Sequence, residues 1–447
     1  MILKVRPSHI GGFVTVPGSK SHTIRAVAIA ALADGVSEIR NPLVSEDTLS
    51  AVEAYRSLGA EIECLEGLWR VKGFERRFGN TARCKVVNET IDVGDSGTTL
   101  YIAMGIAALG FEESTFIGNE RIMRRPVKPL ADVLNQLGAL VTCSEKGTPP
   151  VRIVPCRCPK DRDKRAGCFT PKGTREVTLD CSKTSQYLTA LLLNYPTACC
   201  GTVIHAKDLV ERPYIDMTLN WVRSLGIVID EEPGNVFKIR GGQEYKPFTR
   251  DVPSDFSTAT FFLCGSALAS MTYGTPITVK GLDMNDTQGD KGVIDILRQM
   301  GASAEINEEG VTITASRLRG ITVDLGDMPD SLPMLAVTAC FAEGVTGFTG
   351  VAQARLKETD RIAVMRQELT KAGCDIEETE DGLIIRKSDF RGGCLSGHGD
   401  HRVAMSLAVG GCFAQGETVI EDADAVSVTF PGFAEAMVSL GADLVKQ

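Results

Sequence analysis

Apolar residues recur at helical spacing before a glycine in six stretches of the chain, and a short alternating run follows each glycine. The stretches are RSLGAEIE, NQLGALVT, RSLGIVID, RQMGASAE, TKAGCDIE and VSLGADLV, with their glycines at Gly59, Gly138, Gly226, Gly301, Gly373 and Gly441. A glycine directly after an amphipathic pattern ends a helix, and alternation after it predicts a strand. The pattern therefore predicts six repeats that each end in helix, glycine and strand.

A second pattern, a polar cluster that runs into a small and apolar helix, also occurs once in every repeat. The six segments are SKSHTIRAVAIAALADG, DSGTTLYIAMGIAALG, KTSQYLTALLLNYP, SDFSTATFFLCGSALA, PDSLPMLAVTACFAEG and GDHRVAMSLAVGGCFAQG. Serine, threonine and aspartate before an apolar run cap helices, and helices this apolar are buried. If the N-termini of six such helices share one cleft, their partial positive charges attract anions. The alternative is that they are ordinary core helices with ordinary caps.

The repeats predict an α/β protein of two domains with three repeats in each. We expect one domain over residues 20–250 and the other over 1–19 plus 251–447, with hinges near 17–20 and 245–252. The boundary falls where GGQEYKPFTRDVPSD interrupts the repeat. The strand-like start of the chain, MILKVRPSHIGGFVTVPGSK, precedes the first repeat and is expected to pair within the second domain.

Composition narrows the function. The 447 residues are 43% hydrophobic and 23% charged, as in a globular protein of two domains. A net charge of −9 argues against a nucleic-acid-binding protein, so any anionic ligand needs locally clustered cations. We find no secretory signal and no clean apolar run of membrane-spanning length, and we expect a cytoplasmic protein with reduced cysteines.

The polar helix starts carry the candidate chemistry. RLKETDRI at 355–362 holds five charged side chains, and we expect Lys357 and Arg361 on one face of a helix. PDSLP adds Asp330, and GDHR adds Asp400 and Arg402. Surplus cations beside isolated carboxylates suit two anionic substrates, a general base and a stabilised transition state.

Metal and nucleotide sites fit the sequence less well. His398 and His401 resemble a ligand pair, but no HExxH context surrounds them. Cys156, Cys158 and Cys168 form a partial zinc pattern in a charged insert. The phosphate-loop pattern, the dinucleotide fingerprint and the nucleophile elbow are missing from the sequence.

Taken together, the motifs resemble those of the 5-enolpyruvylshikimate-3-phosphate synthases from Pro17 to Phe433. They are PGSKSHTIR, DSGTT, RRPV, SQYLTALL, RPYIDMT, PDSLPML, RLKETDR, GDHRVAM and TFPGF, in the family's order. The resemblance implies an inside-out α/β barrel in two domains, built from six βαβαββ repeats. It also implies a transferase of chorismate and aromatic amino acid biosynthesis that needs no metal or other cofactor. The implied reaction moves the enolpyruvyl group of phosphoenolpyruvate to the 5-hydroxyl of shikimate 3-phosphate through a tetrahedral intermediate, and releases phosphate.

The resemblance also implies roles for individual residues. The implied phosphoenolpyruvate-binding residues are Gly97, Arg125, Gln186, Arg361 and Arg402. The implied acceptor-binding residues are Ser21, Arg25, Thr184, Ser185, Tyr214 and Gln353, with Thr184 and Ser185 at the acceptor's phosphate. The implied catalytic residues are Lys20, Asp330, Lys357 and Glu358. Of these, Asp330 and Lys357 take the hydroxyl proton, and Glu358 protonates the methylene carbon.

The chain departs from the family's pattern beside the expected site. Val428 and Tyr101 stand where the family has a lysine and an arginine. Asp95 and Gln353 stand where it has asparagines, and Glu211 replaces a serine that touches the acceptor's phosphate. These changes leave the expected site more negative than the family's.

Glu211 keeps alternatives open, because a carboxylate beside a phosphate is repulsive unless a cation compensates. Lys183 and Arg124 are the candidate cations. One alternative is an enolpyruvyl transferase for a different, unphosphorylated acceptor that bears a carboxylate. Another is an anion-binding paralogue without activity. In each case we expect small-molecule partners, no nucleic acid or membrane partner, and a monomer.

Overall fold

The computed structural model describes residues 1–74, 84–155 and 175–447. These residues divide into two compact units. The N-terminal unit is Lys20–Val252, and the C-terminal unit combines Met1–Ser19 with Pro253–Gln447. The cysteine pattern that suggested a partial zinc site, at Cys156, Cys158 and Cys168, lies outside the described residues.

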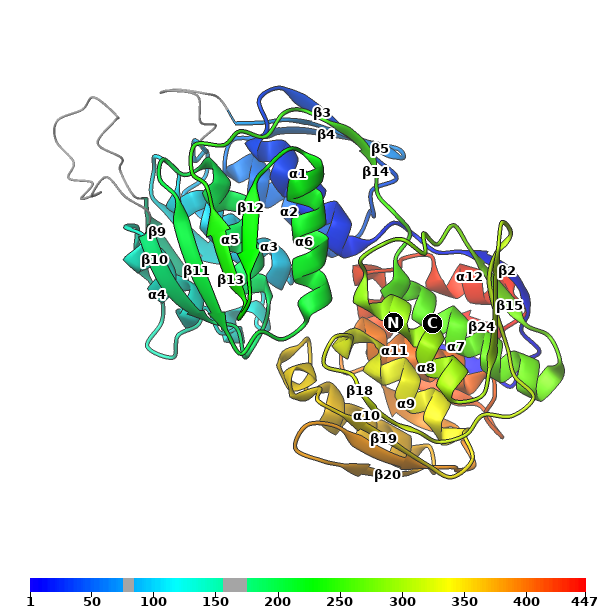
Figure 1. Cartoon of the computed structure of the whole chain (residues 1–447). Coiled ribbons are helices and arrows are strands. Elements are labelled where there is room, and N and C mark those ends of the chain that lie inside the picture. Colours follow the sequence, from blue (N-terminus) through cyan, green and yellow to red (C-terminus); the bar gives the residue numbers. More distant parts are fainter. Residues whose placement is uncertain (75–83, 156–174) are drawn as a thin grey trace, which may run out of the picture. The chain divides into compact units, whose positions relative to one another are not determined.

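The N-terminal unit contains four-stranded sheets that share one strand order. They are β14-β3-β5-β4, β6-β7-β9-β8 and β10-β11-β13-β12, and in each the first two strands are parallel while the other pairs are antiparallel. Figure 1 shows that β14, drawn in green, lies beside the blue strands of the first sheet. The strands are β3 (Val36–Arg40), β4 (Glu61–Leu65), β5 (Leu68–Lys72), β6 (Thr90–Asp92), β7 (Ser114–Ile117), β8 (Leu140–Thr142), β9 (Val151–Val154), β10 (Arg175–Asp180), β11 (Thr202–Lys207), β12 (Ile229–Glu232), β13 (Val236–Ile239) and β14 (Thr249–Asp251).

The C-terminal unit repeats this arrangement with strands from both ends of the chain. Its sheets are β2-β15-β17-β16, β18-β19-β21-β20 and β22-β23-β1-β24. Strand β1 pairs with β23 and β24. Strand β2 pairs with β15, beside which it lies in Figure 1, so the predicted pairing of the N-terminal stretch is confirmed. The strands are β1 (Leu3–Arg6), β2 (Gly12–Thr15), β15 (Ile277–Lys280), β16 (Ser303–Asn307), β17 (Gly310–Thr314), β18 (Thr322–Asp324), β19 (Val345–Thr349), β20 (Asp375–Glu378), β21 (Leu383–Arg386), β22 (Gly393–Ser396), β23 (Thr418–Glu421) and β24 (Asp443–Lys446).

The predicted apolar helices are all present and almost wholly buried. In the N-terminal unit they are α1 (Lys20–Leu32), α3 (Gly97–Ala108) and α5 (Gln186–Asn194). In the C-terminal unit they are α7 (Phe256–Tyr273), α9 (Leu332–Cys340) and α11 (His401–Gly411). Helix α3 packs against α1 and α5, and α7, α9 and α11 pack against one another. The apolar residues of each set belong to the hydrophobic core of their unit.

The remaining helices are amphipathic and end at the predicted glycines. They are α2 (Glu46–Ser57), α4 (Lys128–Gln136), α6 (Arg212–Ser224), α8 (Val293–Gln299), α10 (Arg361–Lys371) and α12 (Phe433–Ser439). All six glycines that follow them have φ between +83° and +104°, a region that other L-residues rarely adopt. At Gly59 an added Cβ would also lie 2.4 Å from the Lys85 carbonyl oxygen. The prediction of six glycine-terminated helices is therefore confirmed.

The predicted βαβαββ order occurs uninterrupted in two repeats of the N-terminal unit and in the middle repeat of the C-terminal unit. Strands and α-helices follow one another as β6, α3, β7, α4, β8, β9, as β10, α5, β11, α6, β12, β13 and as β18, α9, β19, α10, β20, β21. Elsewhere a strand from a distant part of the sequence, such as β1 or β14, completes the sheet. Among the described helices, none combines the length and the apolarity that crossing a bilayer requires.

Candidate active site

Arg361 lies at the centre of a carboxylate cluster in the C-terminal unit. Its Nη1 donates to Asp330 Oδ1 and its Nη2 to Glu358 Oε2, both at 2.6 Å. Its Nε donates to Asp400 Oδ2 at 2.8 Å, and Nη2 also lies 3.2 Å from Asp400 Oδ1. Arg402 Nη2 lies 3.1 Å from Asp330 Oδ2. The fold therefore brings together side chains from RLKETDRI, PDSLP and GDHR.

Two buried helices begin at this cluster. Asp330 lies in the short helix η4 (Pro329–Ser331), which leads directly into α9. Asp400 caps α11, because its Oδ1 accepts a hydrogen bond from Arg402 N at 2.9 Å. The free N–H groups and the dipoles of these helix starts add positive potential where the carboxylates gather.

The prediction that Lys357 and Arg361 share one face of a helix is wrong. Helix α10 begins at Arg361, because Asp360 caps it by accepting a hydrogen bond from Ala363 N at 3.0 Å. Lys357 lies outside α10, in an extended conformation at the end of the short helix η5 (Ala352–Leu356). The local N-cap therefore decides where the helix starts, and the i, i+4 spacing has no structural meaning here.

Burial and charge oppose each other in the cluster. Arg361 is 1% exposed and Asp400 is fully buried. Burial alone would lower the pKa of Arg361, but the carboxylates of Asp400, Glu358 and Asp330 raise it well above its usual value. Burial alone would raise the pKa of Asp400, but Arg361 outweighs burial and the pKa is lowered. The ion pair between Arg361 and Asp400 is therefore fully charged at neutral pH.

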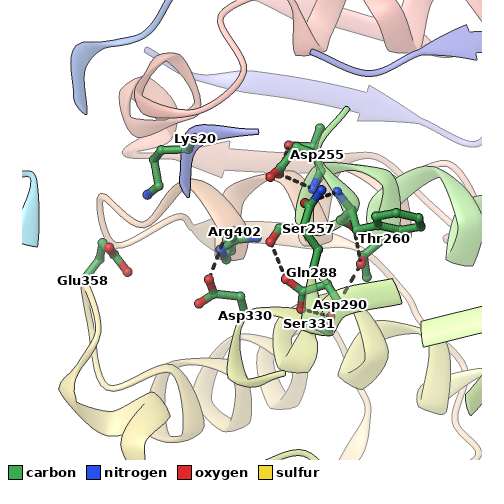
Figure 2. A network of polar contacts seen from close by, with 12 residues as sticks. Lys20, Asp255, Ser257, Thr260, Gln288, Asp290, Asp330, Ser331, Glu358 and Arg402 are labelled. Atoms are coloured by element: carbon green, nitrogen blue, oxygen red, sulfur yellow. Dashed lines mark hydrogen bonds and ion pairs between the residues drawn. The ribbon is translucent and has the colours of Figure 1, made fainter. Parts of the chain in front are cut away.

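A second carboxylate network lies next to Asp330, and sequence analysis missed it. Asp290 is buried, and it accepts hydrogen bonds from the hydroxyls of Ser257 and Ser331, the latter at 2.5 Å (Figure 2). Burial and the nearby Asp330 raise the pKa of Asp290, although Arg402 and the two hydroxyls oppose this. Asp290 lies in DTQGDKG, a loop-like stretch with no periodic pattern, so only the tertiary structure reveals it.

Gln353 and His398 have structural contacts. Gln353 lies in η5, is 6% exposed, and donates from Nε2 to the Gly326 carbonyl at 2.8 Å. His398 Nε2 lies 2.7 Å from Glu368 Oε1, which ties the loop before α11 to α10. Among the described residues, no group of three or more histidine, cysteine, aspartate or glutamate side chains could hold a metal ion.

In the N-terminal unit, Arg25 is a buried cation surrounded by neutral groups. It is 1% exposed, and its Nε donates to Thr218 Oγ1 at 3.0 Å. Its Nη1 and Nη2 donate to the carbonyls of Ser21 and Tyr214 at 3.0 and 3.1 Å. Nη2 also lies 3.5 Å from Thr189 Oγ1. Burial lowers the pKa of Arg25 to about 10, and no described carboxylate forms an ion pair with it.

Lys20, by contrast, already has an acidic partner. It is the first residue of α1, and its Nζ lies 3.0 Å from Asp47 Oδ2. Asp47 lies in the first turn of α2 and is 4% exposed. Sequence analysis did not single out Asp47, because SEDTLS also has the pattern of an ordinary helix start.

Gly97, Arg125 and Gln186 come together at the starts of α3 and α5. A Cβ added to Gly97 would lie 3.7 Å from the Arg125 guanidinium carbon and 3.7 Å from Gln186 Oε1. The backbone of Gly97 therefore comes close to both side chains, and a side chain at this position would fill the space between them. Gln186 Oε1 is buried and has no hydrogen-bond partner among the described residues.

Thr184 and Ser185 converge on Glu211. Glu211 Oε2 accepts hydrogen bonds from Thr184 Oγ1 at 3.2 Å, from Ser185 Oγ at 3.3 Å and from Ser185 N at 3.4 Å. Glu211 is 1% exposed and has φ +54° and ψ +45°, a left-handed conformation directly before α6. The donors implied for an acceptor's phosphate thus bind a carboxylate of the chain itself.

Neither Arg124 nor Lys183, the two candidate cations, forms an ion pair with Glu211. The Arg124 side chain is 81% exposed and lies 3.6 Å from Glu120. Lys183 is exposed, at the end of the loop before α5. Glu211 instead accepts hydrogen bonds from hydroxyl and N–H donors at the start of α5, which the sequence analysis did not foresee.

The other departures from the expected motifs have local explanations. Asp95 Oδ2 lies 2.7 Å from Arg121 Nη1, so a cation compensates the added carboxylate. Tyr101 is buried, donates to the Pro126 carbonyl at 3.0 Å and packs edge-to-face on Tyr187. Val428 is buried at the end of a short helix over Ala423–Val428.

Comparisons with known proteins agree over nearly the whole chain. The family model described as EPSP synthase (3-phosphoshikimate 1-carboxyvinyltransferase) matches residues 5–437. Proteins named 3-phosphoshikimate 1-carboxyvinyltransferase from Acetivibrio thermocellus and Methanocaldococcus jannaschii are 45% and 38% identical, and the alignments cover 99% of each chain. A solved structure of EPSP synthase from Acinetobacter baumannii is similar with a TM-score of 0.79 and 28% identity, and covers 100% of both chains.

Proposed function

The chain belongs to the EPSP synthase family, and we propose that it transfers the enolpyruvyl group of phosphoenolpyruvate to the 5-hydroxyl of shikimate 3-phosphate. The hydroxyl oxygen adds to C2 of phosphoenolpyruvate while C3 takes a proton, which gives a tetrahedral intermediate. Loss of phosphate from C2 and of a proton from the new methyl group then yields the enolpyruvyl ether. The reaction needs a base for the hydroxyl, an acid for C3 and cations for two anionic substrates.

The arrangement around Arg361 carries the proposal. One guanidinium holds Asp330 on Nη1 and Glu358 on Nη2, so the two carboxylates lie side by side and at fixed positions. We assign Asp330, with Lys357, to the removal of the hydroxyl proton, and Glu358 to the protonation of C3. A pair of carboxylates positioned in this way suits a reaction that removes one proton and delivers another.

Binding of phosphoenolpyruvate would change this cluster. A carboxyl group that accepts a charge-assisted hydrogen bond from arginine is held in its ionised form, which cannot protonate C3. If the substrate carboxylate binds Arg361 and Arg402, it competes with Glu358 for the Arg361 donors. Glu358 then loses a cation and binds a proton more readily. The proposal therefore couples substrate binding to the activation of the acid.

Arg25 is the residue we assign to the acceptor's ring carboxylate, together with Ser21 and Tyr214. Among the described residues no carboxylate pairs with its buried guanidinium, and neutral oxygens take its hydrogen bonds. A buried cation of this kind gains more from an added carboxylate than a surface arginine does. We assign Gln353 to the acceptor as well.

The donors for the phosphate of phosphoenolpyruvate come from three segments of the N-terminal unit. Arg125 and Gln186 both lie next to Gly97, at the starts of α3 and α5. Helix starts with an adjacent arginine suit a phosphate group. Lys20 would join them after exchanging its contact with Asp47 for the ligand.

One observation favours a second candidate acceptor. Glu211 takes the donors of Thr184 and Ser185, so an unphosphorylated acceptor would meet less competition at this position than a phosphorylated one. Arg25 would still bind the ring carboxylate of such an acceptor. This second acceptor would be an alcohol that bears a carboxylate, such as shikimate itself.

Phosphate release from phosphoenolpyruvate tests both candidates. Shikimate 3-phosphate, shikimate and 3-hydroxybenzoate are supplied as separate acceptors, and the rates are compared with a blank that lacks an acceptor. We expect release with shikimate 3-phosphate that exceeds the other rates by at least about tenfold. Faster release with shikimate would support the second candidate, and no release above the blank with any acceptor would refute both.

A further inference from the structure

Glu211 has contacts that the proposed reaction does not use. Three donors, the Thr184 hydroxyl and both the hydroxyl and the N–H of Ser185, meet at one oxygen of its carboxylate. The carboxylate is buried, and the N–H belongs to the N-cap residue of α5. Two hydroxyls and an N–H at a helix start are typical donors to an oxyanion, and the structure already has an oxyanion in that position.

The backbone of Glu211 indicates that these contacts are specific. Its φ of +54° is left-handed, which is unfavourable for a residue other than glycine, asparagine or aspartate. Three hydrogen bonds to a charged, buried group offset that cost. The contacts of the carboxylate therefore help to hold the start of α6 in place.

We propose that the Glu211 carboxylate is a built-in competitor for the phosphate of the acceptor, and that it lowers the chain's affinity for phosphorylated acceptors. This inference rests on the proposed function, because it assumes that Thr184 and Ser185 receive that phosphate. The phosphate cannot take these donors while Glu211 Oε2 occupies them. Two anions at one set of donors also repel each other strongly in a buried site.

The consequence is a reduced discrimination between acceptors. Phosphate binding must move Glu211 away from Thr184 and Ser185, and this displacement costs part of the binding free energy. An unphosphorylated acceptor leaves Glu211 in place and is unaffected. Glu211 is therefore a specificity-determining residue: it narrows the difference in affinity between shikimate 3-phosphate and shikimate.

Two variants separate the charge of Glu211 from its structural role. Glu211→Gln keeps the length of the side chain and an acceptor oxygen, but removes the charge. Glu211→Gly removes the side chain and adopts the left-handed conformation without strain. Asp216→Asn is the matched control, because it removes one negative charge from a half-buried position of the same helix, where Asp216 pairs with Arg212.

The experiment is calorimetric titration of each protein with shikimate 3-phosphate and, separately, with shikimate, at low salt and without phosphoenolpyruvate. We expect both Glu211 variants to bind shikimate 3-phosphate at least about fivefold more tightly than wild type, a change of about 1 kcal/mol. Their affinity for shikimate, and both affinities of Asp216→Asn, should stay within about twofold of wild type.

The outcomes distinguish this inference from the proposed function. If wild type turns over shikimate 3-phosphate but neither Glu211 variant binds it more tightly, Glu211 is no competitor and the inference is wrong. Weaker binding by Glu211→Gln would make the carboxylate part of the binding site and overturn the inference as well. If wild type neither binds nor turns over shikimate 3-phosphate, the proposed function is wrong, and the inference about Glu211 loses its basis. A tighter complex in Glu211→Gln alone still supports the inference, since Glu211→Gly also removes contacts of α6.

Discussion

Arg361 and Asp400 form a buried ion pair that joins the first residue of α10 to the N-cap of α11. Arg361 Nε donates to Asp400 Oδ2 at 2.8 Å, and the exposed fractions of the two side chains are 1% and 0%. Asp400 also accepts a hydrogen bond from the backbone N–H of Arg402, so one carboxylate holds the Arg361 guanidinium and the first turn of α11. Arg361 is thereby fixed before any substrate binds, which favours catalysis because less has to reorganise during the reaction.

Asp400→Asn should destabilise the C-terminal unit. Removing one partner of a buried ion pair leaves the other charge uncompensated, and typically costs about 3–5 kcal/mol. Asp330 and Glu358 still pair with Arg361, so we expect the lower end of that range. Urea denaturation measures the change. Asp375→Asn, which breaks an exposed pair with Arg386, is the control and should cost less than about 0.5 kcal/mol. Equal denaturation midpoints for the two variants would contradict the prediction.

Glu358→Gln should abolish protonation of C3 and leave substrate binding largely intact. Loss of a general acid lowers kcat by about 10²–10⁴-fold. The KM values should change far less, because the amide oxygen of the substituted side chain can still accept a hydrogen bond from Arg361. A second measurement is deuterium uptake into the methylene group of phosphoenolpyruvate in heavy water, which requires protonation at C3 and should disappear. Glu380→Gln, on an exposed loop, is the control. A variant with unchanged deuterium uptake would exclude Glu358 as the acid.

The order of helices and strands could be predicted from the sequence, because the residues that indicate each element lie within that element or next to it. Gly59 and Gly441 follow amphipathic helices and have φ of +100° and +104°, as the glycine caps predicted. The apolar helices were predicted from capping residues followed by a run of small apolar residues, and their burial followed because a helix without a polar face has to be buried. Strand partners were harder to predict. That β14 would complete the first sheet of the N-terminal unit depends on tertiary structure, and nothing in TRD indicates it.

The candidate site was predictable only where a motif carries it. Asp330 and Arg361 stand out as charges beside apolar runs, whereas Asp290 and Asp47 acquire partners only when distant segments meet. The prediction that Lys357 lies on a helix with Arg361 was wrong, although the sequence did indicate the correct helix start. Asp360 precedes an apolar run, and an aspartate in that position is an N-cap. The resemblance placed Glu211, Thr184 and Ser185 at the same phosphate, but only the structure shows that the carboxylate accepts the hydrogen bonds of these donors, which precede it by 26 and 27 residues.

The buried Asp290 should make the stability of the protein depend on pH. The substitution Asp290→Asn should remove this part of the pH dependence. Its pKa is raised in the folded state, so the folded protein binds this proton more tightly than the unfolded chain does. That contribution to stability is fully present below the unfolded value of about 3.8 and is lost as pH rises through the raised folded value. Asp290→Asn cannot ionise and should gain stability relative to wild type as pH increases.

Denaturation of wild type and Asp290→Asn at pH 5 and pH 8 measures this effect. The charged groups that face Asp290 are Asp330 and Arg402, and both remain in the variant. The difference between the two proteins therefore isolates Asp290. We expect the stability of Asp290→Asn relative to wild type to be higher at pH 8 than at pH 5, because wild type loses the contribution of the protonated carboxyl group as pH rises. A difference that does not change with pH would show that Asp290 stays in one protonation state.

Arg25→Gln should lose affinity for the acceptor without losing stability. A charged hydrogen bond to a ligand carboxylate contributes about 1.5–3 kcal/mol, so KM for the acceptor should rise about 10–150-fold. KM for phosphoenolpyruvate should stay within about twofold, since other residues are assigned to it. If Arg25 had only a structural role, the same substitution would lower the stability of the protein and leave the KM for the acceptor unchanged.

The stability measurement decides between these roles. No described carboxylate pairs with Arg25, and burial already lowers its pKa to about 10, so its charge opposes folding. Thermal unfolding of Arg25→Gln without ligands should therefore match or exceed that of wild type. Arg56→Gln, at an exposed pair with Glu53, controls for the change in net charge and should leave both KM values unchanged. A variant with lower stability and an unchanged acceptor KM would remove Arg25 from the acceptor site. A gain in stability with a loss of acceptor affinity would show that Arg25 is retained for binding at the expense of the fold.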